Sequence, residues 1–148
     1  MTIYQQYPNH RITLLAGWLF FCFSMNVEAE IAIVVNPSNS IKTITLDELN
    51  QIFFKKIKTF SNDRQIIPVG QSNKMPITKM FNKKVLKKSN RQIRHFWTRR
   101  MFSSNGTPPR ALVDNRDVIA FVSGNRKAIG YVDKNAVTDS VKVILIIP

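Results

Sequence analysis

Three polar residues stand directly before an expected helix and could bind a small anion. Ser72, Asn73 and Lys74 lie shortly before Pro76, and proline is frequent in the first turn of a helix. Together they offer a hydroxyl, an amide and an ammonium group. A helix N-terminus favours oxyanions, because its free backbone amides and its dipole attract negative charge. The alternative interpretation is that Ser72 or Asn73 simply caps the helix.

A second polar group follows the first apolar run of the chain. Ser38, Asn39 and Ser40 come after Asn36-Pro37, where the run 30–36 ends. Asn and Ser are typical of turns because their side chains bond to nearby backbone groups, and proline fixes one backbone angle. These residues therefore predict a polar turn.

The sequence contains no recognisable catalytic or metal-binding constellation. Its single cysteine, Cys22, and one of its two histidines, His10, fall in an N-terminal segment that we expect to be removed. The remaining His95 has no cysteine with which to bind a metal, and no serine lies in a nucleophile elbow. The carboxylates at expected helix starts are explained as capping or first-turn residues: Asp47, Glu48, Asp114 and Asp117. We expect a protein that is not an enzyme and that uses no metal or cofactor.

Residues 1–29 have the order of parts of a secretory signal peptide. A polar segment ends at Arg11, an uncharged apolar run covers 12–23, and a more polar stretch ends in the small residue Ala29. The apolar run is shorter than the roughly 20 residues that span a bilayer. We therefore predict cleavage near Ala29 and a periplasmic or secreted protein; the alternative is that the segment stays as an anchor. The remainder, 30–148, is the length of one domain.

The chain is strongly basic, with 22 Lys and Arg against 9 Asp and Glu, a net charge of +13. Such a charge attracts phosphate-like ligands, acidic lipid head groups or nucleic acid. Four basic residues around Trp97 would suit a nucleic-acid-binding helix: Arg91, Arg94, His95 and Arg99. However, Trp97 lies on the apolar stripe of that helix and away from the charges. We therefore expect a solvated basic face without a nucleic-acid partner, and keep peripheral membrane contact as a further alternative.

The pattern of apolar residues predicts strands that alternate with helices. Strands are expected over 30–36, 65–69, 128–132 and 141–147. Helices are expected after Thr45, which forms a capping box with Glu48, near Pro76, after Ser89, which pairs with Gln92, and after Asp114. This order predicts the α/β class, with a mixed sheet flanked by helices.

Two local features extend this prediction. Pro68 lies inside the second expected strand, and a proline there indicates an edge strand or a strand end. The strongest amphipathic stripe of the chain is formed by four residues of the helix after Ser89: Ile93, Phe96, Trp97 and Met101. The stripe marks the face of this helix that we expect to turn towards the core.

Four segments occur here in the same order as in a known family. They are Val35-Asn36-Pro37, the run 46–53 (LDELNQIF), Pro108-Pro109-Arg110, and the run 128–132 (AIGYV). With them the chain resembles the phosphate-type substrate-binding proteins of ABC transporters, which have the type 2 periplasmic binding protein fold. It is most similar to a short, single-lobe branch of that superfamily.

The resemblance implies the second lobe with its hinge strands, and a missing first lobe. In the family the ligand lies in the cleft between lobes, and the loop that corresponds to Ser38 and Asn39 lines it. Gln71 falls where the family has an anion-binding Arg, and Asn73 where it has an Asp. The run 75–77 (MPI) replaces the family's Ser-Gly-Thr, so the phosphate site is altered more than the fold.

These inferences lead to one functional prediction and one alternative. We predict an exported, non-catalytic, solute-binding-like module for phosphate or another small oxyanion, with an envelope or transporter protein as a partner. The candidate ligand-binding residues are Ser38, Asn39, Gln71, Ser72, Asn73 and Lys74. The alternative is an envelope adaptor or sensory protein that keeps the lobe fold without a small ligand.

Overall fold

The structure is a computed structural model that describes residues 29–60 and 65–148. Apart from Ala29, the predicted signal peptide lies outside the described residues. Among the helices of the described part, none is both long and apolar enough to cross a membrane.

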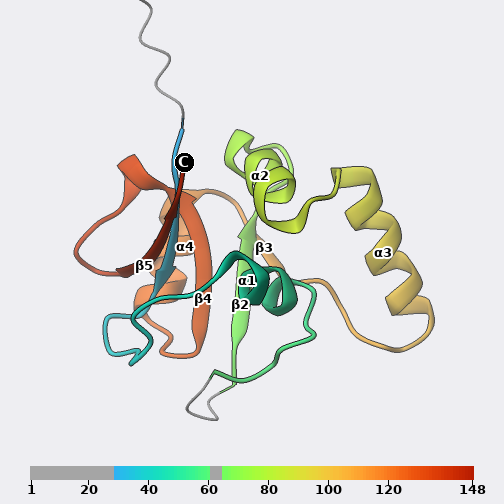
Figure 1. Cartoon of the computed structure of the whole chain (residues 1–148), viewed down its shortest axis with the longest axis horizontal. Helices are drawn as coiled ribbons and strands as arrows, with labels where there is room; N and C mark the ends of the chain where they lie inside the picture. The colour runs from blue at the N-terminus through green and yellow to red at the C-terminus, as the bar shows by residue number, and fades with distance from the viewer. Residues whose placement is uncertain (1–28, 61–64) are drawn as a thin grey trace, which may run out of the picture.

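A five-stranded sheet forms the centre of the molecule (Figure 1). Its strands are β1 (Ile31–Val35), β2 (Ile67–Gln71), β3 (Arg110–Leu112), β4 (Ala128–Asp133) and β5 (Lys142–Ile147), in the spatial order β3-β2-β4-β1-β5. β2 runs parallel to β3 and β4, whereas β1 runs antiparallel to both β4 and β5. The predicted mixed sheet is confirmed.

The helices begin where their capping residues predict. They are α1 (Leu46–Phe53), α2 (Pro76–Phe81) continued by the π-helical turn η1 (Asn82–Leu86), α3 (Asn90–Phe102), α4 (Asn115–Ser123) and the short 3₁₀ turn η2 (Lys134–Ala136). Both capping boxes form, at Thr45 with Glu48 and at Ser89 with Gln92. Asp114 accepts a hydrogen bond from the Asp117 amide and caps α4.

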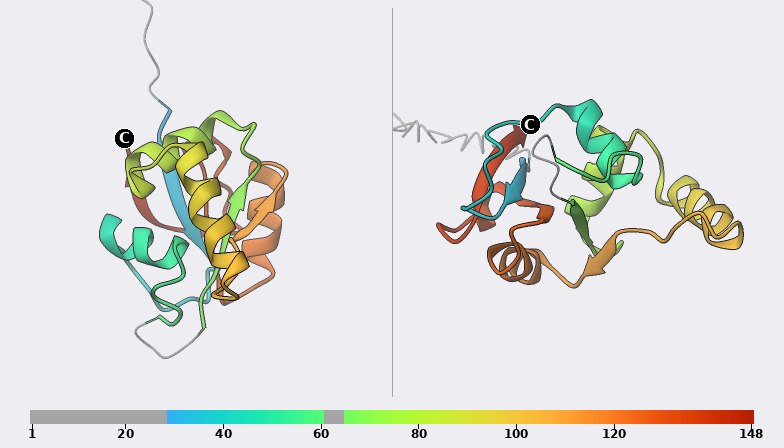
Figure 2. Two further views of the ribbon diagram at one scale, coloured as in Figure 1. Left: turned by 90° about the vertical axis from the view of Figure 1, so that its right-hand side faces the viewer. Right: turned by 90° about the horizontal axis from the view of Figure 1, so that it is seen from below.

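The two faces of the sheet are covered by different helices (Figure 2). Alternate residues of β1 point to opposite faces, so Ile31 and Ile33 pack with α1 and α2 while Ala32 and Val34 pack with α4. α4 packs tightly on β4 at Gly130, where an added Cβ would lie 2.7 Å from a methyl group of Val118. A glycine is therefore required at that position.

Two strand predictions need correction. β2 covers Ile67–Gln71 rather than 65–69, and β3, a strand of three residues that follows Pro109, was not predicted at all. β2 is also not an edge strand, because it lies between β3 and β4. Pro68 is tolerated because it stands next to the start of β2, where β4 pairs with it but β3 has not yet begun.

The predicted apolar stripe of α3 is buried only in part. α3 projects from one side of the molecule (Figure 1), and Trp97 is its one buried residue. Phe96 and Trp97 pack against Phe54, but Met101 is 50% exposed. Arg100, on the same stripe, donates hydrogen bonds to the Asn105 carbonyl and closes the end of the helix. The predicted inward packing of Trp97 is confirmed, and the stripe joins the core through this aromatic cluster.

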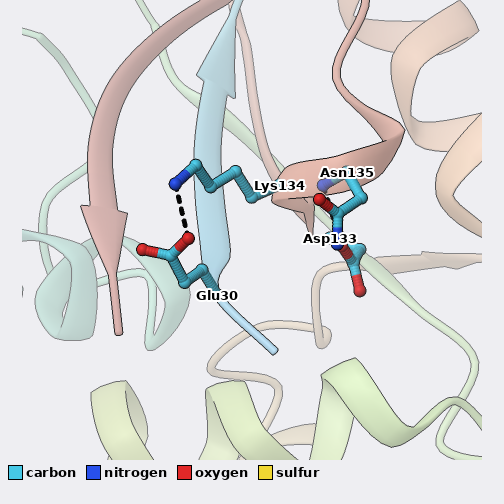
Figure 3. A network of polar contacts seen from close by, with 4 residues as sticks. All are labelled: Glu30, Asp133, Lys134 and Asn135. Carbon is cyan, nitrogen blue, oxygen red and sulfur yellow. Dashed lines mark hydrogen bonds and ion pairs between the residues drawn. The ribbon is translucent and has the colours of Figure 1, made fainter. Parts of the chain in front are cut away.

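β1 begins at the same end of the sheet at which β4 and β5 end. Ile31 pairs with both Asp133 and Ile147. Beside them, the ammonium group of Lys134 forms an ion pair with Glu30 (Figure 3). Asp133 accepts a hydrogen bond from the Asn135 amide and so starts η2. At this end of the sheet, residues near the start of β1 therefore contact residues about a hundred positions later in the chain.

Candidate functional site

Three parallel strands end together and create the best candidate site. The last residues of β2, β3 and β4 are Gln71, Leu112 and Asp133, and we call this end of the sheet the carboxyl edge. Ligands of open α/β sheets usually bind outside the carboxyl ends of strands. An open hollow of about 440 Å³ lies there, lined by Met75, Asp114, Asn115, Arg116, Ile119, Ala136 and Thr138.

The turn 72–75 forms one side of the carboxyl edge. The Ser72 amide donates to the Leu112 carbonyl at 2.8 Å, and the Ser72 carbonyl accepts from the Met75 amide at 2.9 Å. The Ser72 hydroxyl accepts from the Lys74 amide at 3.3 Å. The predicted helix cap is wrong: Met75 occupies the cap position and makes no side-chain bond, because the turn already uses the Ser72 groups.

Two groups of this turn are available to a ligand. The side chains of Asn73 and Lys74 are exposed. Within the described residues, the amide nitrogens of Asn73 and Ile77 donate no hydrogen bond, whereas Pro76 has no N–H to offer. Lys74 therefore offers one positive charge beside two unused donors.

Gln71 is part of the floor of the site and does not face a ligand. Its side chain is buried and its Nε2 donates to Asn115 Oδ1 at 2.7 Å and to the Tyr131 carbonyl at 3.0 Å. Its Oε1 is buried without a hydrogen-bond partner among the described residues. The residue at the position of the family's Arg thus joins β2, β4 and α4 to one another.

Tyr131 makes the same floor rigid. Its hydroxyl accepts a hydrogen bond from the Gln71 amide at 3.2 Å and donates one to Thr78 Oγ1 at 3.1 Å. Its ring stacks on Phe81, with ring centroids 4.0 Å apart and an angle of 9° between the rings. Burial raises the pKa of the Tyr131 phenol, so the hydroxyl stays neutral and keeps both hydrogen bonds.

Ser38 and Asn39 lie at the opposite end of the sheet. β1 is antiparallel to β4, so its last residue, Val35, lies beside Ile129 near the start of β4. Asn39 is buried; its Nδ2 donates to the Arg126 carbonyl at 3.2 Å, and its Oδ1 accepts from the Ile41 amide at 3.0 Å. The six candidate residues therefore form two separate groups, and the structure does not bring them together.

Asn36 explains why the first polar loop is so ordered. Its Nδ2 donates to the carbonyls of Val122 and Ser123 at the end of α4, at 3.2 and 2.6 Å. Its Oδ1 accepts from the Ser38 amide at 2.9 Å. This loop satisfies the last carbonyls of a helix, as a C-terminal cap does. The prediction of a polar turn is confirmed.

The described residues contain no group of three His, Cys, Asp or Glu side chains that could hold a metal ion. His95 lies exposed on α3. Trp97 is 5% exposed and packs inwards, so it offers no surface on which a base could stack.

Sequence reasoning did not find Asn115 and Arg116 as parts of the site. The cap at Asp114 correctly located the start of α4, but the carboxyl edge became visible only once β3 was known to end at Leu112. A second cavity, of about 320 Å³, was also missed; it lies between α3 and the sheet, with Phe81, Trp97, Met101 and Pro109 in its lining.

No protein-family model matches the sequence, and neither does any curated protein. Solved structures do match. An ABC-type phosphate transport receptor from Vibrio cholerae superposes with a TM-score of 0.62 at 21% identity. A protein described as a phosphate ABC transporter substrate-binding protein with bound phosphate, from Clostridium perfringens, gives 0.61 at 20% identity. PstS from Borrelia burgdorferi gives 0.59 at 15% identity.

Each match covers 78% of this chain, but only 45%, 44% and 46% of the respective larger chains. The chain thus spans less than half the length of these proteins. At such identities the likeness concerns the fold alone. The matched part contains the mixed sheet with helices on both faces. The chain therefore has the α/β fold of one lobe of the phosphate-transport substrate-binding proteins.

Proposed function

We propose that this protein is an exported, non-catalytic, solute-binding-like module for phosphate or a similar small oxyanion. The observation that carries the proposal is the turn 72–75, which offers the Lys74 ammonium group and the unused Asn73 amide at the carboxyl edge, followed by a second unused amide at Ile77 in the first turn of α2. Backbone amides beside a cation are the chemistry that oxyanions need. The shared lobe fold supports this choice, because one matched protein was solved with bound phosphate.

Binding by this chain alone is weak in this proposal. The carboxyl edge is an open hollow, and hinge closure of a second lobe is the means by which two-lobed binding proteins bury a ligand. A second surface must then complete the site. A second protomer or an envelope or transporter protein would supply it.

Thermal unfolding with anions tests the proposal. Phosphate, sulfate and chloride are compared at fixed ionic strength, with the unfolding midpoint as the readout. A ligand that binds only the folded state stabilises it, by about 2.7 kcal/mol at a hundredfold excess over the dissociation constant. We expect the midpoint to rise more with phosphate than with sulfate.

A pair of charge reversals locates the effect. Lys74→Glu removes the cation of the turn, and Lys127→Glu makes the same charge change at an exposed residue of the opposite end of the sheet. We expect Lys74→Glu to abolish the phosphate-specific shift and Lys127→Glu to preserve it. An equal loss in both variants, or an equal shift with sulfate in the parent chain, would mean general screening of the basic surface.

A second candidate function is an adaptor that keeps the lobe fold without a small ligand. Specific observations favour it: the Gln71 Nε2 group and both ends of the Asn39 amide are used in internal hydrogen bonds, and Pro76 removes one amide from the start of α2. A folded chain whose midpoint ignores every anion, and which binds an envelope protein with unchanged affinity after Lys74→Glu, would establish this alternative.

A further inference from the structure

One continuous part of the chain contains no acidic residue. From Gln65 to Val113 there are 11 Lys and Arg and no Asp or Glu. This stretch builds α2, η1, α3 and the edge strand β3. Elsewhere in the chain acidic and basic residues are interspersed. This stretch, which also contains β2, therefore carries +11 of the net charge of +13.

Part of this charge lines another open hollow, separate from the two cavities described above. The hollow is about 730 Å³ and lies where η1 joins α3; its cations are Lys79, Lys83, Lys87, Lys88 and Arg91. Lys79 of α2, Lys83 of η1 and Lys87, the residue that ends η1, all line the hollow. Within the described residues, no carboxylate forms an ion pair with any of these cations. The hollow therefore attracts anions strongly.

The outer side of α3 continues this surface. Arg91, His95 and Arg99 are four residues apart, and Phe102 follows three residues later, so the four share one side of the helix. Phe102 is 88% exposed, the most exposed of the large hydrophobic side chains in the described part. We call the five cations of the hollow, together with Arg99 and Phe102, the basic face.

We propose that the basic face docks on the surface of a bilayer that contains anionic phospholipids. The phosphate groups of the lipids occupy the lysine-lined hollow at the start of α3, and Phe102, at the other end of the same helix, inserts among the head groups. Clustered cations next to a projecting aromatic ring are the combination that holds proteins at an anionic membrane surface. α3 projects from one side of the body (Figure 1), and the side chains of Arg91, Arg99 and Phe102 on it are exposed.

Two other occupants fit the basic face less well. A second copy of the chain would bring an equal positive face into contact, and like charges repel. A single-stranded nucleic acid needs aromatic rings on which its bases can stack, but Phe96 and Trp97 pack inwards against Phe54. Phe102 is a single exposed ring, which can insert into a lipid interface but cannot stack with a row of bases.

Co-sedimentation of the whole chain with vesicles tests the proposal. Vesicles of phosphatidylcholine alone are compared with vesicles that also contain phosphatidylglycerol. Residues 1–28 contain one Arg and one Glu, so they bring no net side-chain charge and no preference for anionic lipid. We expect binding to the anionic vesicles to be much tighter and to fall steeply as salt rises, because salt screens exposed charges.

Matched variants locate the contact. Lys79→Gln with Lys83→Gln removes two charges of the hollow, and Arg126→Gln with Lys127→Gln removes two exposed charges elsewhere. Each cation close to the surface contributes about fivefold in affinity, so the first pair should weaken binding about 25-fold and the second much less. Phe102→Ser should weaken binding about tenfold, whereas Val113→Ser, another exposed apolar residue, should not.

Three results would overturn the proposal. They are equal binding to both kinds of vesicle, equal losses in the two charge pairs, and tighter binding to an oligonucleotide than to anionic vesicles. Far-ultraviolet circular dichroism and the unfolding midpoint of each variant show whether it is folded. All the substituted side chains are exposed, so we expect the variants to keep the fold.

Discussion

Two short polar loops, one at each end of the sheet, have similar sequences and opposite properties. The loop 36–40 (NPSNS) and the turn 72–75 (SNKM) both follow a strand and both contain Ser and Asn. In the first loop, Asn36 and Asn39 are buried and hydrogen-bonded to backbone groups near the end of α4. In the second, Asn73 and Lys74 are exposed.

The difference shows that residue type alone does not mark a binding site. An Asn side chain that satisfies carbonyls at a helix end is a structural part, because those carbonyls would otherwise be buried without partners. The same side chain at the carboxyl edge meets solvent and stays available. The difference follows from strand direction. β1 is antiparallel to β4 and β2 is parallel to β4, so the loop after β1 and the turn after β2 lie at opposite ends of the sheet.

The comparison predicts the largest loss of stability for a substitution of Asn36. Asn36→Ala removes the donor to the Val122 and Ser123 carbonyls and the acceptor for the Ser38 amide. Because these groups are buried or partly buried, we expect a loss of about 3 kcal/mol in the free energy of unfolding. Urea unfolding measures it, and a loss below about 1 kcal/mol would contradict the structural role of this loop.

A smaller effect is expected at the floor of the carboxyl edge. Tyr131→Phe deletes the hydroxyl that joins the Gln71 amide to Thr78, which should cost about 1–2 kcal/mol at neutral pH. The ring stack on Phe81 remains. Gln71 then loses one anchor but keeps the hydrogen bonds of its own side chain, so the fold should persist.

The same variant has a pH signature. Burial raises the pKa of Tyr131 above its ordinary value of 10.0, so the neutral phenol stabilises the folded state fully below about pH 10. That contribution is lost as the pH rises through the folded-state pKa. The stability advantage of the parent chain over Tyr131→Phe should therefore shrink above pH 10. A difference that is constant from pH 8 to 11 would show that the hydroxyl is not buried.

The smallest effect is expected at the open turn. Lys74→Ser should change the free energy of unfolding by less than about 0.5 kcal/mol, because the Lys74 side chain is exposed and the turn is held by the backbone of Ser72. Urea unfolding beside Asn36→Ala compares the two ends of the sheet directly. A large loss in Lys74→Ser would mean that this turn, too, is structural.

Local signals in the sequence were enough for most of the elements. Thr45, Ser89 and Asp114 cap their helices as predicted, because a cap depends only on residues three positions away. β3 was missed because three residues after two prolines show no alternation. The apolar stripe of α3 is buried only in part because it contacts an aromatic cluster at the rim of the core.

The candidate site was predictable only in part. Ser72, Asn73 and Lys74 could be proposed from the sequence because they follow a strand and precede a proline. The separation of Ser38 and Asn39 from them depends on strand direction, which periodicity does not reveal. The burial of Gln71 depends on Asn115, a residue 44 positions later in the chain. Long-range contacts of this kind are set by topology.

The central position of β1 has a consequence for how the chain folds. β1 is made first, yet its two neighbours, β4 and β5, follow about a hundred residues later. A strand of this kind cannot pair until nearly the whole chain has been synthesised, and such long-range pairing is slow. The sheet therefore cannot close early. A delay of this kind would suit a polypeptide that must pass through a narrow channel in an extended state.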